Sequence, residues 1–132
     1  MVEPPVSSGR DPRESAEWLR RALSAARVGT WEWDVRAGRV SWSREVMSIF
    51  GITEFGGTFD AWGKLVHPAD FEYAKATVER ALQDRASTDF RIEHRSIVTG
   101  GKVVWVEGRG QVQRDENGEP LLIIGIVQDV TQ

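Results

Sequence analysis

The sequence predicts an α+β domain: a five-stranded antiparallel sheet with helices on one face, preceded by an amphipathic N-terminal helix. Two observations lead to this prediction. Apolar residues in the long segment that ends near residue 83 repeat every three to four positions, whereas over residues 89–97 they alternate. The last three expected strands are joined by short turns, which makes them antiparallel neighbours. Helices and strands in this order form a two-layer architecture.

An amphipathic helix is expected over residues 13–28, after a lead-in over residues 1–12 that is rich in Pro, Ser and Gly and therefore flexible. Acidic residues come early and basic residues late, as the helix dipole favours, and Gly29 is a stop signal. Four turns of helix are marginal on their own, so the apolar stripe needs a partner surface. This stripe contains Trp18, Leu19, Ala22 and Leu23.

A hairpin is expected after this helix, because residues 30–35 alternate and place Trp31 and Trp33 on one face. A turn then leads into a short return strand. Ser43 is a good N-cap for the next helix, and Gly51 ends it. A Gly-Gly loop and one short apolar turn complete the first half of the chain.

A second long helix is expected from Pro68 to Gln83, since proline suits a first helical turn and acidic residues follow it. Three strands come next, over residues 89–97, 102–113 and 121–127. The last of them is continuously apolar, as expected for a central strand that is covered on both faces.

Composition narrows the possible functions. The 132 residues suit one domain, and 17 Lys and Arg against 20 Asp and Glu give a net charge of −3, which argues against a nucleic-acid partner. No apolar run is long enough for a membrane span. With no cysteine and two histidines, neither disulfides nor a metal site are expected, and a cytoplasmic location fits. Six Trp indicate a large aromatic core or interface.

A series of short motifs in a fixed order carries a family resemblance. The motifs are Gly29-Thr30-Trp31-Glu32-Trp33-Asp34, Trp42-Ser43, Phe50-Gly51, His67-Pro68-Ala69-Asp70, Glu93-His94-Arg95, residues 101–107, residues 114–120 and residues 125–131. Together they resemble a PAS domain with its trailing PAC segment, in the bacterial sensory subtype with a Trp-rich first strand. The resemblance implies that residues 29–132 form a curved antiparallel sheet whose covering helices enclose a small cavity.

The same resemblance implies a signal-sensing or signal-relay module of a larger bacterial protein, of the sensor histidine kinase or diguanylate cyclase type. The downstream effector domain would then be a partner within the same chain. Asp129 and Thr131 would tie the last strand to that output, and we expect the chain, which stops at Gln132, to be a fragment. The alternative is a purely structural dimerisation module with a collapsed cavity and no ligand.

By this resemblance, the sheet face beneath the helices lines the cavity. Gly108 and Gly110 lack side chains there, which leaves room either for a Trp ring or for an apolar or aromatic ligand, and both alternatives stay open. The candidate cavity residues are Trp31, Trp33, Ile92, His94, Ser96, Val106, Gly108, Gly110, Ile123 and Val127, with Val104 and Gly125 on the same face.

Histidine and cysteine usage limits the cofactors. His94 could orient a ligand or sense pH, or it could be a hydrogen-bonded core histidine, whereas His67 is expected to fix the loop at a helix start. Haem-binding relatives use a histidine in the long helix, and its absence here disfavours haem. The lack of cysteine excludes a cysteinyl-flavin adduct. No catalytic residues are expected, because Glu93 and Glu107 both alternate outward.

The outer face of the sheet is expected to need a cover. Trp105, Ile124 and Ile126 alternate away from the cavity, and large apolar residues on a sheet surface mark a contact. The N-terminal stripe of Trp18, Leu19, Ala22 and Leu23 is the natural cover, either from the same chain or from a second subunit. A two-fold homodimer is the simplest assembly. In the other reading, the helix closes the core of its own chain in a monomer.

Overall fold

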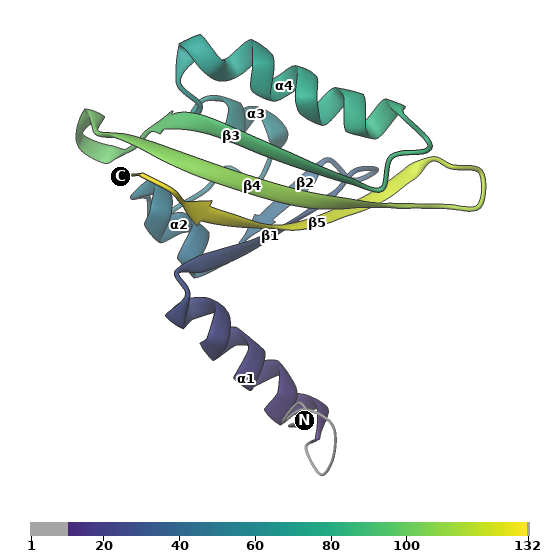
Figure 1. Cartoon of the computed structure of the whole chain (residues 1–132), viewed down its shortest axis with the longest axis horizontal. Coiled ribbons are helices and arrows are strands. Elements are labelled where there is room, and N and C mark those ends of the chain that lie inside the picture. Colours follow the sequence, from purple (N-terminus) through teal and green to yellow (C-terminus); the bar gives the residue numbers. More distant parts are fainter. Residues whose placement is uncertain (1–10, 132) are drawn as a thin grey trace, which may run out of the picture.

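The structure is a computed structural model that describes residues 11–131, and it confirms the α+β class (Figure 1). One antiparallel sheet has the strand order β2-β1-β5-β4-β3. In the described part of the chain, no helix has the length and apolar character needed to cross a membrane. The elements are α1 (Pro12–Ala25), β1 (Val28–Asp34), β2 (Arg39–Trp42), α2 (Arg44–Phe50), α3 (Phe59–Gly63), α4 (Pro68–Gln83), β3 (Asp89–Ile97), a 3-10 turn (Thr99–Gly101), β4 (Val103–Arg114) and β5 (Pro120–Asp129).

The core lies between the inner face of the sheet and helices α2, α3 and α4. Val46 and Phe50 of α2 pack against β4, while Ala74 and Val78 of α4 pack against β3. Ile123 is fully buried in the middle of β5, in contact with the end of α4 and with β4. The strand with the most continuous apolar sequence is therefore central, as expected. It is not covered on both faces, because Ile123 is the one buried residue of β5 and Ile124 and Ile126 on the outer face are half-buried.

The alternating pattern placed the strands well. The structure has β3 at the expected residues, β4 displaced by one residue, and β5 longer than expected at both ends. Within the central pair, Trp31 lies opposite Gly125 and Trp33 lies opposite Ile123. The inward residues of β1 therefore stand directly beside those of β5, and the middle of the sheet becomes the floor of the candidate site.

Helix α1 is shorter than the expected range of residues 13–28. Asp11 caps it by accepting a hydrogen bond from the Glu14 backbone N–H at 2.8 Å, and the helix ends at Ala25. Arg27 adopts a left-handed backbone conformation, with φ of 58°, and turns the chain into β1. Val28 then pairs with Gln128 of β5. Residues 1–10 of the expected lead-in lie outside the described residues.

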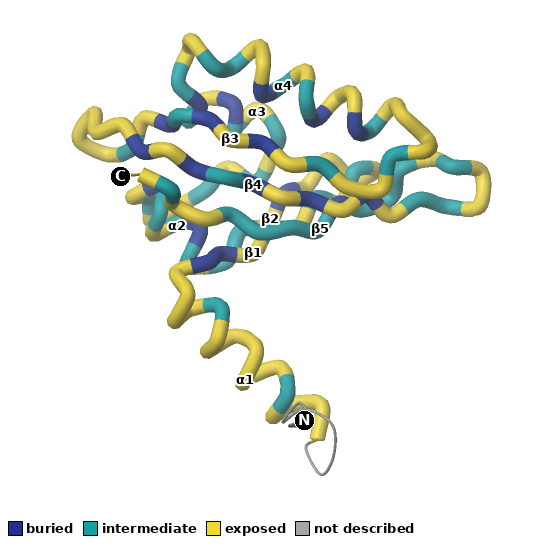
Figure 2. Tube along the Cα trace, viewed as in Figure 1, coloured by how far each residue is buried: buried dark blue, intermediate teal, exposed yellow. Residues whose placement is uncertain are grey.

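Helix α1 projects away from the rest of the domain (Figure 1), and Figure 2 shows that its residues are exposed or only partly covered. None of its described residues is buried, and Leu19 is 53% exposed. The reading in which this helix closes the core of its own chain is therefore wrong. The two-residue link from Ala25 to β1 directs the helix outward, so it covers neither face of its own sheet.

Arg114, at the end of β4, fastens the C-terminus of α4 to the rest of the fold. Its guanidinium donates to the backbone carbonyls of Ala81 at 2.7 Å, Leu82 at 3.0 Å and Asp84 at 2.9 Å, and to Gly118 at 3.1 Å. Within residues 11–131 it pairs with no carboxylate. The last carbonyls of a helix carry partial negative charge, so this cation stabilises the helix end directly.

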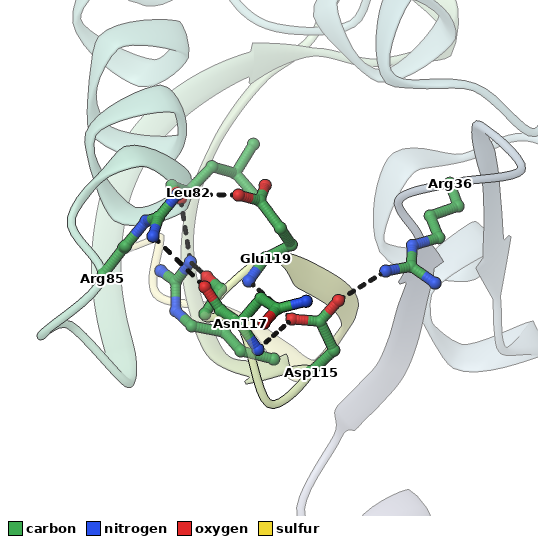
Figure 3. A network of polar contacts seen from close by, with 8 residues as sticks. Arg36, Leu82, Arg85, Asp115, Asn117 and Glu119 are labelled. Atoms are coloured by element: carbon green, nitrogen blue, oxygen red, sulfur yellow. Dashed lines mark hydrogen bonds and ion pairs between the residues drawn. The ribbon is translucent and has the colours of Figure 1, made fainter.

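The turn between β4 and β5 is held by a polar network on the surface (Figure 3). Asp115 accepts hydrogen bonds from the backbone N–H groups of Asn117 at 2.8 Å and Glu119 at 3.0 Å. Arg36 and Arg85 approach the turn from opposite sides, pairing with Asp115 and Glu119, each at 2.7 Å. These contacts fix the far end of the central hairpin.

Candidate functional site

A cavity of about 70 Å³ lies between the inner face of the sheet and the helices. Every strand of the sheet and each of helices α2, α3 and α4 contributes to its wall. None of the lining side chains is a carboxylate, lysine or arginine. The lining residues are Trp31, Trp33, Val40, Trp42, Phe50, Phe59, Trp62, Val78, Phe90, Ile92, His94, Val106, Gly108 and Val127.

Seven of the ten candidate cavity residues line this space, and three do not. Ser96 and Ile123 are fully buried in the surrounding core, and Gly110 lies beneath the Phe90 ring. The wall also contains residues that sequence reasoning missed, most of which come from the return strand and the helices, while Phe90 comes from β3. The apolar stripes of those helices were the available signal, but a stripe does not say which of its members reach a cavity. The missed residues are Val40, Trp42, Phe50, Phe59, Trp62, Val78 and Phe90.

Aromatic rings pack against one another around the cavity. Trp42 stacks on Phe55 with ring centroids 3.7 Å apart and on Phe50 at 4.8 Å. On the opposite side, Phe59 bridges Trp33 at 5.0 Å and Trp62 at 5.2 Å. Such ring pairs contribute stability beyond the area they bury. The cavity is therefore the remainder of an aromatic core, not an open cleft.

The glycines of the inner face play different roles. A Cβ on Gly110 would lie 2.5 Å from the Phe90 ring, and one on Gly125 would lie 2.7 Å from the Trp31 ring. Aromatic rings therefore fill the space above both positions. The ring above Gly110 is that of Phe90, not the tryptophan ring that was one of the two expected alternatives. Gly108 differs, because it lines the cavity and its nearest neighbour, Ile92, is 3.3 Å from the Cβ position.

His94 is only 3% exposed and lines the cavity. Its Nδ1 lies 3.0 Å from the carbonyl oxygen of Arg95, and because a carbonyl can only accept, Nδ1 carries the proton. Burial lowers the pKa of the imidazole below its ordinary value, so the ring is neutral near pH 7. Nε2 therefore presents a lone pair. Trp62 packs edge-on against the ring, with centroids 5.5 Å apart.

The indoles of Trp31 and Trp33 lie two residues apart but differ in their hydrogen bonds. Trp31 Nε1 donates to the carbonyl oxygen of Ile126 at 3.1 Å. Trp33 Nε1 is buried, and no described residue accepts its hydrogen. A buried donor without a partner costs about 1–3 kcal/mol, so the Trp33 N–H needs an explanation.

His67 lies outside the cavity wall and caps α4. Its Nδ1 accepts a hydrogen bond from the Ala69 backbone N–H at 3.0 Å, and the backbone N–H of His67 donates to the carbonyl oxygen of Arg95 at 2.9 Å. It therefore holds the start of α4 against β3, next to His94.

Asp70, in the first turn of α4, forms a bidentate ion pair with Arg95 of β3. Its two carboxylate oxygens lie 2.7 Å and 3.0 Å from guanidinium nitrogens, and Oδ2 also accepts the Arg95 backbone N–H at 2.8 Å. The side-chain hydrogen bonds from Arg95 lower the pKa of the Asp70 carboxyl from 3.8 to about 2. Bidentate ion pairs of this kind fix the relative orientation of the two side chains in addition to pairing their charges.

The stability conferred by this ion pair should depend on pH. The native pKa of Asp70 is depressed, so the contribution is complete above pH 3.8 and is lost as the pH falls from there toward 2. Because the pair is partly exposed, we expect Asp70→Asn to lower the free energy of unfolding by about 1–2 kcal/mol at pH 6. Urea titrations from pH 6 to pH 2 measure the difference from wild type. A constant difference over that range would contradict the assignment, and Asp89→Asn, at the exposed start of β3, is the matched control.

The same arginine reaches the end of the last strand. The Arg95 guanidinium lies over the Trp105 ring, 5.5 Å from its centroid. The Trp105 backbone N–H donates to Thr131 Oγ1 at 2.8 Å, and the Val130 N–H donates to the Trp105 carbonyl at 2.8 Å. Asp129 Oδ1 in turn accepts the Thr131 N–H at 2.8 Å. Asp129 and Thr131 thus attach the segment that follows β5 to Trp105 of β4.

The residues expected at an interface lie on two surfaces. On α1, Trp18 is 42% exposed, Leu19 and Ala22 are exposed, and Leu23 is half-buried. On the outer face of the sheet, Trp105 is exposed. Ile124 and Ile126 are half-buried there, beside a hollow of about 970 Å³. A separate groove of about 490 Å³ runs between α1, β1 and α2, and its wall includes Leu19 and Leu23.

The sequence model of a protein family described as PAS fold matches residues 39–127, which is 89 of the 132 residues. The chain belongs to the PAS fold family. The resemblance carried by the sequence motifs is thereby confirmed, while the PAC segment and the subtype stay predictions.

Signalling proteins from bacteria contain similar PAS sequences. The chain is 29% identical over 123 residues to a blue-light-activated histidine kinase of Brucella anthropi, covering 92% of this chain and 24% of that protein. It is 25% identical over 117 residues to a probable diguanylate cyclase of Escherichia coli, covering 88% of this chain and 10% of that protein. The chain thus spans a quarter or less of these relatives, and it is a sensory module of the kind they carry.

Solved structures have the same fold. A sensory box histidine kinase/response regulator from Burkholderia thailandensis superposes with a TM-score of 0.72 at 27% identity, covering 86% of this chain and 84% of that chain. The N-terminal domain of a diguanylate cyclase with PAS/PAC sensor from Marinobacter aquaeolei gives a TM-score of 0.69 at 20% identity, covering 79% and 95%. The second likeness supports the fold alone.

Proposed function

We propose that this PAS domain senses a small molecule in its aromatic cavity and relays the occupancy of the cavity to the C-terminal end of β5. The output would be a histidine kinase or diguanylate cyclase effector in the same chain, acting in the cytoplasm. The domain itself would bind and relay without catalysing a reaction. The observation that carries the proposal is a continuous set of contacts from His94 at the cavity wall to Thr131, which follows the C-terminal end of β5.

The contacts follow one another through Arg95. The His94 ring nitrogen Nδ1 and the His67 backbone N–H both donate to the Arg95 carbonyl, at 3.0 Å and 2.9 Å. The Arg95 side chain in turn holds Asp70 of α4 and lies over Trp105, whose N–H is bound by Thr131. A ligand that moves the His94 ring would disturb the Arg95 backbone, and through it both the start of α4 and the end of β5. Contiguity alone does not measure coupling, so the relay needs a direct test.

Small-molecule sensing is tested by native mass spectrometry of the protein purified without denaturant, together with thermal unfolding against a metabolite panel. We expect a co-purifying mass, or a compound that raises the melting temperature by several degrees. A chain with no bound mass and no stabilising compound would instead support the alternative function, a structural dimerisation module with a collapsed cavity. The observation that favours this alternative is the cavity volume of about 70 Å³, well below that of common ligand pockets.

The relay predicts a local effect of Thr131→Val, which keeps the side-chain shape but removes the oxygen that accepts the Trp105 N–H. We expect amide exchange at Trp105 to accelerate by at least about tenfold and global stability to fall by about 1 kcal/mol. Residue-resolved hydrogen exchange measures both effects. Thr88→Val, on the exposed segment before β3, is the matched control. Unchanged protection at Trp105 would remove Thr131 from the relay.

The exposed stripe of α1 is proposed to pack against α1 of a second copy, across the groove beside β1. Leu19 and Leu23 line this groove together with Arg20, Arg44 and Glu45, so an apolar floor is bordered by both signs of charge. A two-fold pairing would place identical stripes and opposite charges face to face. Val28, which follows α1, pairs with Gln128 near the C-terminal end of β5. Such a dimer would therefore bring the C-terminal ends of the two β5 strands near the shared helix contact.

Leu19→Glu is expected to convert the dimer into a monomer at micromolar concentration, because it buries a charge in the proposed helix contact. Sedimentation equilibrium measures the change in mass. Ser24→Glu introduces the same charge at an exposed position on another side of α1 and should leave the dimer intact. A wild-type chain that is monomeric, or a Leu19→Glu variant that still dimerises, would contradict the α1 contact.

A further inference from the structure

We propose that the cavity selects a small, neutral, planar molecule with one hydrogen-bond acceptor and one donor, the acceptor bound by Trp33 Nε1 and the donor bound by His94 Nε2. This inference rests on the proposed sensing function and specifies the chemistry of the ligand. The wall is apolar apart from the nitrogens of its histidine and tryptophans, and two of these nitrogens carry the inference.

The first is the indole N–H of Trp33. Trp33 lines the cavity, and its Nε1 is buried with no acceptor among residues 11–131. Trp31, its neighbour on the same face, donates to the Ile126 carbonyl, so the fold satisfies one of the two indoles and leaves the other unused. Buried donors are nearly always paired, which points to an acceptor supplied from the adjoining cavity.

The second is Nε2 of His94. The ring is almost fully buried, and within the described residues its hydrogen bonds involve Nδ1 alone. Because the proton resides on Nδ1 and faces the Arg95 carbonyl, Nε2 can only accept. A ligand that offers a donor there would meet the nitrogen of His94 that no described residue binds.

The wall excludes charge and limits size. No carboxylate, lysine or arginine lines the cavity, so an ionised ligand would lose its hydration without gaining a partner. The volume of about 70 Å³ is roughly half that of an engineered 150 Å³ apolar cavity that holds benzene. A five-membered ring or a short amide therefore fits this class. Ordered water could also meet both polar atoms, and the experiment separates that case.

The test uses three planar rings of nearly equal size: pyrazole with a donor and an acceptor, pyrrole with a donor only, and isoxazole with acceptors only. Each is titrated into the ¹⁵N-labelled protein, and the indole N–H signals are followed by NMR. Trp33→Phe and Trp31→Phe assign the two signals. Trp31 is the internal control, because its N–H already donates to the Ile126 carbonyl.

We expect pyrazole to saturate the protein and to bind at least about tenfold more tightly than pyrrole or isoxazole. At saturation, the Trp33 indole proton should move downfield more than that of Trp31. His94→Phe should abolish the advantage of pyrazole over isoxazole, and Trp33→Phe its advantage over pyrrole. If either variant fails to fold, the other still tests its own half of the site.

Equal affinities of the three rings, or a Trp33 signal that does not move at saturation, would overturn the ligand class while leaving a binding cavity and the proposed function in place. If none of the rings saturates and the Trp33 signal is already that of a hydrogen-bonded indole, water fills the cavity and the ligand class is wrong. The sensing function is then decided separately by the native mass and thermal measurements, which make no assumption about ligand chemistry.

Discussion

Arg114→Met is expected to lower the free energy of unfolding by about 3–4 kcal/mol. The methionine keeps the length of the side chain but cannot donate. The carbonyls of Ala81, Leu82 and Asp84 would lose a charged donor at the C-terminus of α4, and the Gly118 carbonyl would lose its link to that helix. Hydrogen bonds from a charged donor are about twice as strong as neutral ones, so the losses are larger than for an ordinary surface arginine.

Urea unfolding followed by tryptophan fluorescence and by circular dichroism measures this change. Arg85→Met is the matched control, since Arg85 approaches the same turn but is 67% exposed and pairs with Glu119 at the surface (Figure 3). We expect the control to cost less than about 1 kcal/mol. Comparable losses in the two variants would mean that Arg114 is an ordinary surface cation and that α4 is held by its apolar face alone.

Gly125→Ala is expected to destabilise the domain by about 3 kcal/mol or more, or to prevent folding. The backbone of Gly125 is not left-handed, so the cause is contact alone. A Cβ there would press against the carbonyl oxygen of Arg109 and lie 2.7 Å from two atoms of the Trp31 ring. A backbone oxygen inside a sheet cannot move aside without disturbing the pairing of β4 with β5.

Gly108→Ala is the control for this change, because its Cβ would lie 3.3 Å from the Cγ2 methyl of Ile92 and 3.9 Å from the Ile126 carbonyl oxygen, both farther than the contacts at Gly125. We expect that variant to fold with a loss below about 1 kcal/mol and to reduce the cavity volume. Calorimetric unfolding of both variants measures the difference. A stable Gly125→Ala variant would show that Trp31 does not rest on β5 as described.

The strands could be predicted because alternation has a period of two and each turn between them is short. The inward set of β3 and β4, with Ile92, His94 and Val106, followed from that pattern together with the family resemblance. The direction of α1 could not be predicted. An apolar stripe shows that a helix needs a partner, but the left-handed residue Arg27, which turns the helix away from its own sheet, has no sequence signature.

The prediction gave most of the cavity residues on the sheet, but it missed Val40, Trp42 and Phe90 on the strands and all those on the helices. Strand pairing brings floor residues together by register, whereas Phe59, Trp62 and Val78 meet only because three helices pack at particular angles over the sheet. The hydrogen bonds from Arg114 to the C-terminus of α4 were missed for a related reason. Its partners are backbone carbonyls about thirty residues earlier in the sequence, and backbone carbonyls leave no pattern in a sequence.

The most direct test of the central claim is amide hydrogen exchange at Trp105 and Thr131 with the cavity empty and with it saturated by a ring of the series or by a compound found in the metabolite panel. We expect exchange at both amides to change by at least about threefold on saturation, and this change to be lost in Arg95→Met while the cavity still binds. Saturation that leaves both amides unchanged in the wild-type protein would contradict the link between the cavity and the end of β5.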